Sequence, residues 1–331
     1  MEQRTLGRTG REVSVIGLGT WQLGGDWGQV SESDAHAVLE AAVEAGVTFI
    51  DTADVYGDGR SEELIGTFLR ANPGTEVKVA TKMGRRAPQR PEAYNLPAFR
   101  EWVDRSRRNL GTDRLDLVQL HCPPSVVHAS EEVFDGLETL VQEGSIAAYG
   151  VSVETCQEAM GALTHPNLAT IQIILNAFRR KPLDEVLPAA ADQGVGIIAR
   201  VPLASGLLSG RYTRETVFAE SDHRSFNRRG EAFDVGETFS GVDYETGVQA
   251  AAQFSDLAAE LGPDGATPAQ VALRWVVQQH GVSTVIPGAR SAEQARANAA
   301  AAELPALGDE LLEAVARLYD ERLRSQVHNR W

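Results

Sequence analysis

The chain has 331 residues and a formal net charge of −15 at pH 7, from 31 Lys and Arg against 46 Asp and Glu. Because contacts to nucleic-acid phosphates need clustered basic side chains, this balance excludes a typical nucleic-acid binder and favours small-molecule partners. The chain has no signal-peptide core, no 18-residue apolar run, and no disulfide or metal motif around Cys122 and Cys156, so we expect a cytoplasmic protein without membrane contact or metal, with both cysteines buried as apolar residues.

Short apolar runs recur along the chain at a steady spacing. After a hairpin predicted around Gly7 to Gly10, they fall at 13–19 (VSVIGLG), 47–51 (VTFID), 77–82 (VKVATK), 115–121 (LDLVQLH), 146–152 (IAAYGVS), 171–176 (IQIILN), 194–200 (GVGIIAR) and 282–288 (VSTVIPG). Near-continuous apolar runs of this length are typical of parallel strands that helices cover on their outer face. The runs therefore predict eight parallel strands.

Amphipathic helical patterns separate these runs. Residues 31–46 indicate a helix with Ser31 as N-cap and Gly46 just past the end, and the same period recurs at 61–70 and 130–144. This alternation predicts a single-domain (β/α)8 barrel over the whole chain. An open doubly wound sheet is the alternative, but the glycines of GLGTWQLGG precede the next helix by about a dozen residues, unlike a dinucleotide-binding fingerprint.

The longest irregular segment spans residues 211–241, after the seventh predicted strand. Its mixed charge and scattered aromatic residues indicate a functional loop over the barrel mouth, with partial disorder as the alternative.

Chemistry in such barrels lies at the C-terminal ends of the strands, so the residues at these ends are interpreted as one rim. The predicted rim residues are Gly19, Thr20, Asp51, Lys82, His121, Ser152, Asn176, Arg200 and Gly288. Tyr56 follows Asp51 by five residues in a glycine-flanked turn that can fold its ring over the mouth. Trp21 and Trp27 are either core residues or part of a substrate-pocket wall, and the neighbouring glycines favour the wall.

Four of these residues predict a proton-handling site. A tyrosine has an ordinary pKa near ~10, and an adjacent ammonium group favours the phenolate and lowers that pKa. Asp51 can hold Lys82 in its charged form beside Tyr56, while His121 can donate a hydrogen bond to a substrate oxygen. This combination suits protonation of a carbonyl oxygen while a hydride reaches the carbonyl carbon.

The sequence resembles the aldo-keto reductase superfamily across nearly its whole length. The matching stretches, in chain order, are GLGTW, DTADVYGDGRSEELIG, ATKMG, LDLVQLHCPP, GVSVE, IQIILN, VPLASGLLSGRY and IPGARSAEQARAN. The resemblance is to the bacterial NADPH-dependent type, which is related to potassium-channel β subunits. It implies a barrel that binds NADPH without a separate dinucleotide-binding domain and reduces aldehydes or ketones, with a catalytic tetrad of Asp51, Tyr56, Lys82 and His121.

The resemblance also implies a set of cofactor contacts. They are Gly19, Thr20 and Asp51 at the first strand ends, Ser152 and Gln172 at the nicotinamide carboxamide, Arg200 at its ring, Pro202, Leu203, Gly206, Ser209 and Arg211 around the pyrophosphate, and Gly288, Arg290, Gln294 and Asn298 at the adenosine phosphate. Physical reasoning agrees, because small residues let the backbone approach phosphate and a helix N-terminus presents free N–H groups and a favourable dipole.

The sequence departs from the family pattern at three positions. Val153 follows Ser152 where an asparagine is common, and Ala297 precedes Asn298 where a glutamate is common. Arg200 stands where many members stack an aromatic residue on the nicotinamide. A guanidinium can stack on a ring, but its charge is expected to disfavour the cationic oxidised ring.

Three functions of different classes remain open from the sequence. The first is NADPH-dependent reduction of a small-molecule carbonyl substrate. The second is an NADPH-binding regulatory subunit with little turnover. The third is a barrel hydrolase that uses Asp51 with Asp54 or Glu62 as paired carboxylates or metal ligands, although Lys82 has no task in such a site. A monomer is expected because a barrel needs no partner to close, with a homo-oligomer as the alternative.

Overall fold

The computed structural model describes residues 1–24 and 30–331. Its strands are β1 (Gln3–Thr5), β2 (Glu12–Ser14), β3 (Leu18–Gly19), β4 (Phe49–Asp51), β5 (Lys78–Met83), β6 (Leu117–His121), β7 (Tyr149–Ser152), β8 (Thr170–Ile174), β9 (Gly196–Arg200) and β10 (Val282–Val285). Its α-helices are α1 (Trp21–Gly24), α2 (Glu32–Glu44), α3 (Arg60–Ala71), α4 (Leu96–Leu110), α5 (Glu131–Gln142), α6 (Cys156–Ala162), α7 (Val186–Asp192), α8 (His223–Phe226), α9 (Tyr244–Leu261), α10 (Pro268–Val277), α11 (Ala292–Ala300), α12 (Asp309–Arg322) and α13 (Arg324–Val327). The 3-10 helices that bear on the site are η1 (Gly7–Thr9), η2 (Tyr56–Gly59), η6 (Ala204–Ser209), η7 (Val235–Glu237) and η8 (Phe239–Gly241).

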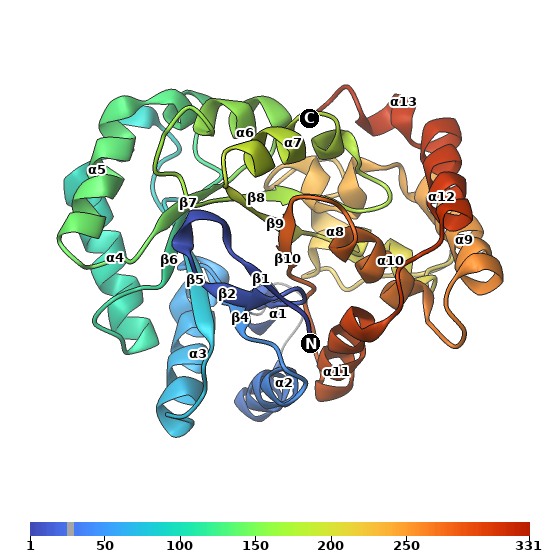
Figure 1. Cartoon of the computed structure of the whole chain (residues 1–331), viewed down its shortest axis with the longest axis horizontal. Helices are drawn as coiled ribbons and strands as arrows, with labels where there is room; N and C mark the ends of the chain where they lie inside the picture. The colour runs from blue at the N-terminus through green and yellow to red at the C-terminus, as the bar shows by residue number, and fades with distance from the viewer. Residues whose placement is uncertain (25–29) are drawn as a thin grey trace.

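Strands β3 to β10 form one parallel sheet in which each strand pairs with the next along the chain. The two edges of this sheet meet, because Ile16 bridges to Val285 and Gly19 bridges to Gly288 in the parallel sense. The amide of Gly19 also donates a hydrogen bond to the Pro287 carbonyl at 3.0 Å. The sheet is therefore a closed barrel with helices around it (Figure 1). The predicted (β/α)8 fold is confirmed.

The N-terminal hairpin is also present where the sequence predicts it. β1 pairs antiparallel with β2, and η1 connects them. The hairpin, dark blue in Figure 1, lies against the N-terminal ends of β8, β9 and β10. At Gly7 the backbone has a φ of 48°, and a Cβ would lie 2.1 Å from the Gly196 nitrogen, so only glycine fits there.

The first predicted strand, 13–19, needs correction because the structure divides it. Val13 belongs to β2 of the hairpin, and only Leu18 and Gly19 belong to the barrel strand β3. The apolar run is continuous because it serves two layers in turn. Val13 helps to fill the floor of the barrel, and Leu18 packs in the main core.

The helices begin and end as their capping residues dictate. Ser31 caps α2, its Oγ accepting a hydrogen bond from the Asp34 amide at 3.1 Å, and Gly46 follows the helix with a φ of 89°. Thr267 caps α10 in a capping box with Gln270. In α2, the face carrying Ala35, Val38, Leu39 and Ala42 is buried, as the period predicts.

Side chains inside the barrel lie in layers, because alternate residues of a strand face the same side. The floor is apolar and contains Leu6, Val13, Phe49, Ala80, Leu117, Ile198 and Ile286. Two residues further along four of these strands the side chain is polar and buried, at Asp51, Lys82, Gln119 and Arg200. This change from apolar to polar along one face sets the candidate site at the C-terminal ends of the strands.

Residues 211–241 fold into short helices over the barrel mouth. Ser205 Oγ donates to the Glu237 carbonyl at 2.9 Å, and Asn176 Nδ2 donates to Ser240 Oγ at 2.8 Å. Asn176, predicted on the rim, follows the C-terminal end of β8; it is buried and holds this segment to the barrel. The segment is therefore a folded cover of the mouth, as the loop prediction favoured.

Candidate active site

One cavity of about 710 Å³ opens at the C-terminal ends of the strands. This volume is typical of sites for small molecules and cofactors. Its wall includes most residues that the sequence predicts for the site, namely Gly19, Thr20, Trp21, Asp51, Tyr56, His121, Ser152, Gln172, Arg200, Pro202, Leu203, Gly206, Ser209, Arg211, Gly288, Arg290, Gln294 and Asn298. Lys82 is fully buried behind this wall. Trp27 lies outside the described residues.

Asp51, Lys82 and Tyr56 form one connected group. β4 and β5 are neighbours, and Lys82 Nζ lies 2.5 Å from Asp51 Oδ1. The same ammonium donates to the Thr52 carbonyl at 2.8 Å and lies 3.4 Å from the Tyr56 hydroxyl. All three donors of Lys82 are thus directed by the protein, with one of them toward the phenol.

The chain places Tyr56 over the mouth by means of a strained turn. Gly57 and Asp58 have φ values of 60° and 56° within η2. A Cβ at Gly57 would lie 2.4 Å from the Gly24 carbonyl oxygen, so glycine is needed both for the backbone angle and for the close approach of α1. This turn directs the ring of Tyr56 back toward Lys82, whose Nζ lies 5.0 Å from the ring centroid.

Burial raises the pKa of Tyr56 above its ordinary value, and the nearby Lys82 charge offsets this only in part. The sequence analysis correctly expects Lys82 to lower the pKa of Tyr56, but it leaves out the larger, opposite effect of burial. The expected net lowering of this pKa is therefore wrong. Burial also disfavours the charged form of Lys82, but Asp51 and Tyr56 outweigh it and the pKa of Lys82 is raised. At neutral pH the site therefore holds an ammonium beside a protonated phenol.

His121 lies at the end of β6, beside Tyr56. The centroids of the two rings are 5.9 Å apart, with the planes close to perpendicular. The pKa of His121 lies well below its ordinary value because burial disfavours the charged ring, and the charges of Arg85, Lys82 and Arg200 act in the same direction. The imidazole is therefore neutral near pH 7, and its Nδ1 has no partner among the described residues.

Two glutamines hold the second oxygen of Asp51. Gln172 Nε2 donates to Asp51 Oδ2 at 2.7 Å, and Gln119 Nε2 donates to the same oxygen at 3.2 Å. Gln172 borders the cavity as predicted, but its described side-chain hydrogen bonds are to Asp51 and Gln119. Gln119 was missed by the sequence reasoning, although it precedes His121 by two residues and so faces the barrel interior with it.

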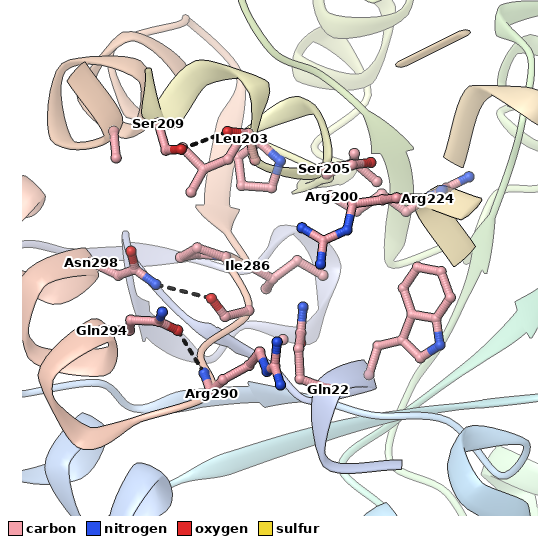
Figure 2. A pocket seen from close by; sticks show the side chains of 18 of the residues that line it. Gln22, Arg200, Leu203, Ser205, Ser209, Arg224, Ile286, Arg290, Gln294 and Asn298 are labelled. Atoms are coloured by element: carbon pink, nitrogen blue, oxygen red, sulfur yellow. Dashed lines mark hydrogen bonds between the residues drawn. The ribbon is translucent and has the colours of Figure 1, made fainter. Parts of the chain in front are cut away.

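The predicted adenosine-phosphate clamp (Gly288, Arg290, Gln294 and Asn298) combines two residues that precede α11 with two that lie within it. Asn298 Nδ2 donates to the Gly288 carbonyl at 3.1 Å, and Gln294 Oε1 accepts from the Arg290 amide at 2.8 Å. Figure 2 shows Arg290, Gln294 and Asn298 on one side of the cavity, with Leu203 and Ser209 across from them. A cation, a glycine and a helix N-terminus at one end of the cavity suit a phosphate group.

The opposite wall follows β9 and includes η6. Gly206 has a φ of 96°, and a Cβ there would lie 2.3 Å from the Tyr212 hydroxyl. Arg211 borders the cavity, as do Tyr212 and Arg224, which the sequence reasoning missed. The cations, the close backbone approach that the glycines allow and the cavity volume together fit an elongated anionic cofactor such as NADPH.

Arg200 has a partner that the sequence analysis does not anticipate. It borders the cavity as predicted, but its Nη1 donates to a carboxylate oxygen of Glu237 from the covering segment. Its Nη2 donates to the Val153 carbonyl at 2.9 Å. The charge that is expected to disfavour the oxidised nicotinamide is thus paired with Glu237, a residue that carries no recognisable sequence signal.

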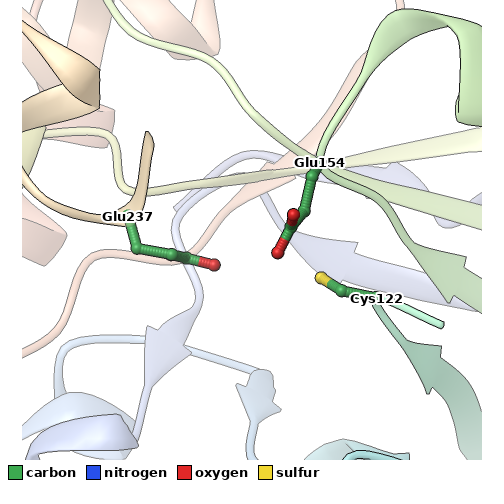
Figure 3. A group of neighbouring side chains, drawn as sticks. All are labelled: Cys122, Glu154 and Glu237. Carbon is green, nitrogen blue, oxygen red and sulfur yellow. The ribbon is translucent and has the colours of Figure 1, made fainter. Parts of the chain in front are cut away.

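Two carboxylate side chains and one thiol lie close together next to Arg200. The ligand atoms of Cys122, Glu154 and Glu237 lie within 4.8 Å of one another (Figure 3). Arg200 pairs with Glu237, and Arg85 pairs with Glu154, so arginines already neutralise the charge that a metal ion would meet. Cys122 was expected to be a buried apolar residue, but it is only half-buried and lies in this polar network.

Trp21 forms an aromatic side of the mouth. Its ring stacks near Tyr56 with centroids 6.2 Å apart and meets Phe233 edge-on at 5.8 Å. Phe233 comes from the covering segment, so the wall includes a residue that the sequence could not place.

The carboxylates of the hydrolase alternative lie away from the mouth. Glu62 accepts hydrogen bonds from Thr81 at 2.5 Å and Asn109 at 2.8 Å, which engage both of its oxygens. Burial raises the pKa of Asp54 to about 7, with the Glu62 charge acting in the same direction. Neither carboxylate borders the described cavity, so they do not form a pair with Asp51 around a bound substrate.

The closed barrel, together with this mouth, defines a (β/α)8-barrel oxidoreductase. The chain belongs to the aldo/keto reductase family, whose model matches residues 15–320. Among described relatives, "Aldo-keto reductase YhdN" of Bacillus subtilis is 33% identical over 301 residues, covering 90% of this chain and 87% of that protein.

Solved structures agree with this assignment. The glycerol dehydrogenase AKR11B4 from Gluconobacter oxydans superposes with a TM-score of 0.76 at 31% identity, over 97% of this chain and 94% of that one. An aldo-keto reductase from Klebsiella pneumoniae in complex with NADPH superposes with a TM-score of 0.72 at 28% identity, over 96% of each chain. No helix in residues 1–24 and 30–331 is both long and apolar enough to cross a membrane.

Proposed function

We propose that this protein reduces aldehydes or ketones to alcohols with NADPH, and that Tyr56 is the proton donor. The observation that carries the proposal is the position of the Tyr56 hydroxyl, at the edge of the cavity and 3.4 Å from the buried Lys82 ammonium. NADPH would lie between the clamp and η6 and supply the hydride. The Klebsiella relative that was crystallised with NADPH supports this choice of cofactor.

The residues of the chain divide the remaining work. Tyr56 gives its proton to the carbonyl oxygen, and the ammonium of Lys82 stabilises the phenolate that remains. Asp51 keeps Lys82 charged and in place through the 2.5 Å contact. Neutral His121, with its proton on Nε2, donates a hydrogen bond to the same substrate oxygen and so orients the carbonyl group.

Oxidation of NADPH in the presence of a nitrobenzaldehyde tests the proposal. We expect NADPH to be consumed with formation of one alcohol for each NADPH. A change of NADPH fluorescence on binding without turnover would favour the regulatory-subunit alternative. Absence of any NADPH binding would overturn the proposal.

A further inference from the structure

A small chamber shares Trp21, Tyr56, His121 and Glu237 with the wall of the main cavity. We refer to it as the side chamber. Its volume is about 130 Å³, well above the roughly 10 to 15 Å³ that one water molecule needs. Its wall combines Trp21, Val55 and Phe233 with Tyr56, His121, Arg85 and Glu237. Since Tyr56 and His121 border both spaces, a carbonyl group held between them can extend its remaining atoms into the side chamber.

Arg85 reaches the side chamber from the strand that supplies Lys82. β5 ends at Met83, and Gly84 then turns the chain with a φ of 103°, close against the ring of Tyr94. Arg85 Nη2 donates to Glu154 Oε1 at 3.3 Å, and its guanidinium lies 6.0 Å from the Phe233 ring centroid. The side chain keeps 25% of its area exposed and forms part of the chamber wall.

Arg85 differs from its neighbours Arg200 and Arg179 in how much of its guanidinium is engaged. Arg200 donates to Glu237 and to the Val153 carbonyl, and Arg179 donates to the Glu154 carbonyl and stacks on Trp331. Arg85 makes one hydrogen bond with the described residues, whereas a guanidinium has five N–H donors in a planar fork. Such a fork suits the two oxygens of a carboxylate.

Glu154, the ion-pair partner of Arg85, competes only weakly with a bound anion for the charge of this arginine. Burial raises the pKa of Glu154 to about 7. The nearby carboxylates of Asp234 and Glu237 also raise this pKa, whereas the charges of Arg200 and Arg85 lower it. Figure 3 shows the carboxylates of Glu154 and Glu237 directed into the same space. Glu154 can therefore take up a proton when an anion approaches Arg85, whereas Glu237 stays paired with Arg200.

We propose that Arg85 is a specificity-determining residue, and that the side chamber selects carbonyl substrates that carry a carboxylate a few bonds from the reacting group. The inference rests on the proposed function, because it places the reacting carbonyl between Tyr56 and His121. The apolar wall holds the atoms between the two groups, and the guanidinium of Arg85 binds the carboxylate.

Matched aldehydes test this selection, because a nitro group has the shape of a carboxylate without its charge. The values of kcat/KM for 3- and 4-carboxybenzaldehyde are compared with those for the nitrobenzaldehydes substituted at the same positions. For at least one ring position, Arg85→Leu should lower the ratio of kcat/KM for the carboxybenzaldehyde to kcat/KM for the nitrobenzaldehyde by roughly tenfold to a hundredfold, as expected for loss of a charge-assisted contact. Arg85→Lys, which keeps the charge without the fork, should give an intermediate ratio.

Arg86 provides the matched control, because it is adjacent in the chain but pairs with Asp58 and borders neither space. Arg86→Leu should leave the ratio unchanged, which separates local binding from a general loss of positive charge. An Arg85→Leu ratio equal to that of the wild type at both positions would overturn the inference.

Equilibrium binding makes the test independent of turnover. Benzoate should bind the NADPH-loaded wild type more tightly than benzamide, and this preference should be lost in Arg85→Leu. If the wild type reduces no aldehyde but keeps this preference, the proposed function fails while the anion site stands. If it reduces aldehydes without any preference for benzoate or the carboxybenzaldehydes, the anion site fails alone.

Discussion

Two of the buried ion pairs at the barrel mouth, Asp51 with Lys82 and Arg200 with Glu237, are built in different ways. Asp51 and Lys82 lie on neighbouring strands, and the pairing of β4 with β5 sets their separation. Arg200 also ends a strand, but its partner Glu237 belongs to the segment that covers the mouth. The first pair is thus fixed by the register of the sheet, whereas the second forms only when residues 211–241 have folded onto the barrel.

This difference suggests a division of work. Beside the first pair lies the Tyr56 hydroxyl, which can exchange a proton with a substrate. The second pair lies among backbone carbonyls, and Ser205 and Asn176 hold the same segment in place. A buried pair gives little net stability, but removal of one partner leaves a buried charge without compensation. We therefore expect changes to the first pair to affect the chemical step and changes to the second to affect cofactor binding.

The largest expected effect is that of Tyr56→Phe, which removes the proton donor and keeps the ring. Turnover should fall by ~10² or more, the usual range for loss of an acid catalyst, while NADPH binding stays nearly intact. Steady-state kinetics together with a fluorescence titration of NADPH measures both quantities. Retention of at least half the wild-type turnover would remove Tyr56 from this role.

The next effect concerns the coupling of Asp51 and Lys82. Asp51→Asn and Lys82→Met each disturb the same group, so their losses in transition-state free energy should not add in the double variant. The measurement is kcat/KM for the four proteins, with thermal unfolding as the check that each one folds. Strict additivity would mean that the two residues act independently in spite of their 2.5 Å contact.

Arg290 lies outside both ion pairs and provides a reference for cofactor affinity. Arg290→Ala should weaken NADPH by roughly tenfold to a hundredfold and leave NADH almost unchanged, because only NADPH carries the 2′-phosphate. Titration of the two cofactors gives the comparison. Equal weakening of both cofactors would place Arg290 away from the 2′-phosphate.

The smallest effect is expected at the second ion pair. Glu237→Gln leaves the Arg200 charge uncompensated, so NADP⁺ should weaken relative to NADPH by roughly threefold to tenfold. Replacement of Arg200 by Trp removes that charge and should not produce this shift. The measurement is the ratio of the dissociation constants of NADP⁺ and NADPH for both variants. An unchanged ratio in Glu237→Gln would mean that Arg200 does not lie close to the nicotinamide.

The contrast between the two pairs also explains what the sequence could predict. The ends of strands can be predicted from apolar runs, so Asp51, Lys82 and His121 could be assigned to one rim. The alternation of side chains along a strand also predicts that Gln119 faces the same interior as His121. Glu237 and Phe233 could not be found, because an irregular segment has no period that relates its residues to the barrel. The net pKa of Tyr56 was also misjudged, since burial depends on what covers the mouth.

The most direct test of the central claim follows the hydride itself. NADPH that carries deuterium at the transferred C4 position is incubated with the protein and a nitrobenzaldehyde, and the product is analysed by mass spectrometry. We expect one deuterium on the former carbonyl carbon of each alcohol formed, in amounts equal to the NADPH consumed, and about a hundredfold less labelled alcohol from Tyr56→Phe in the same time. NADPH binding without labelled alcohol, or an equal yield from Tyr56→Phe, would contradict the claim that this mouth reduces a carbonyl group with Tyr56 as its proton donor.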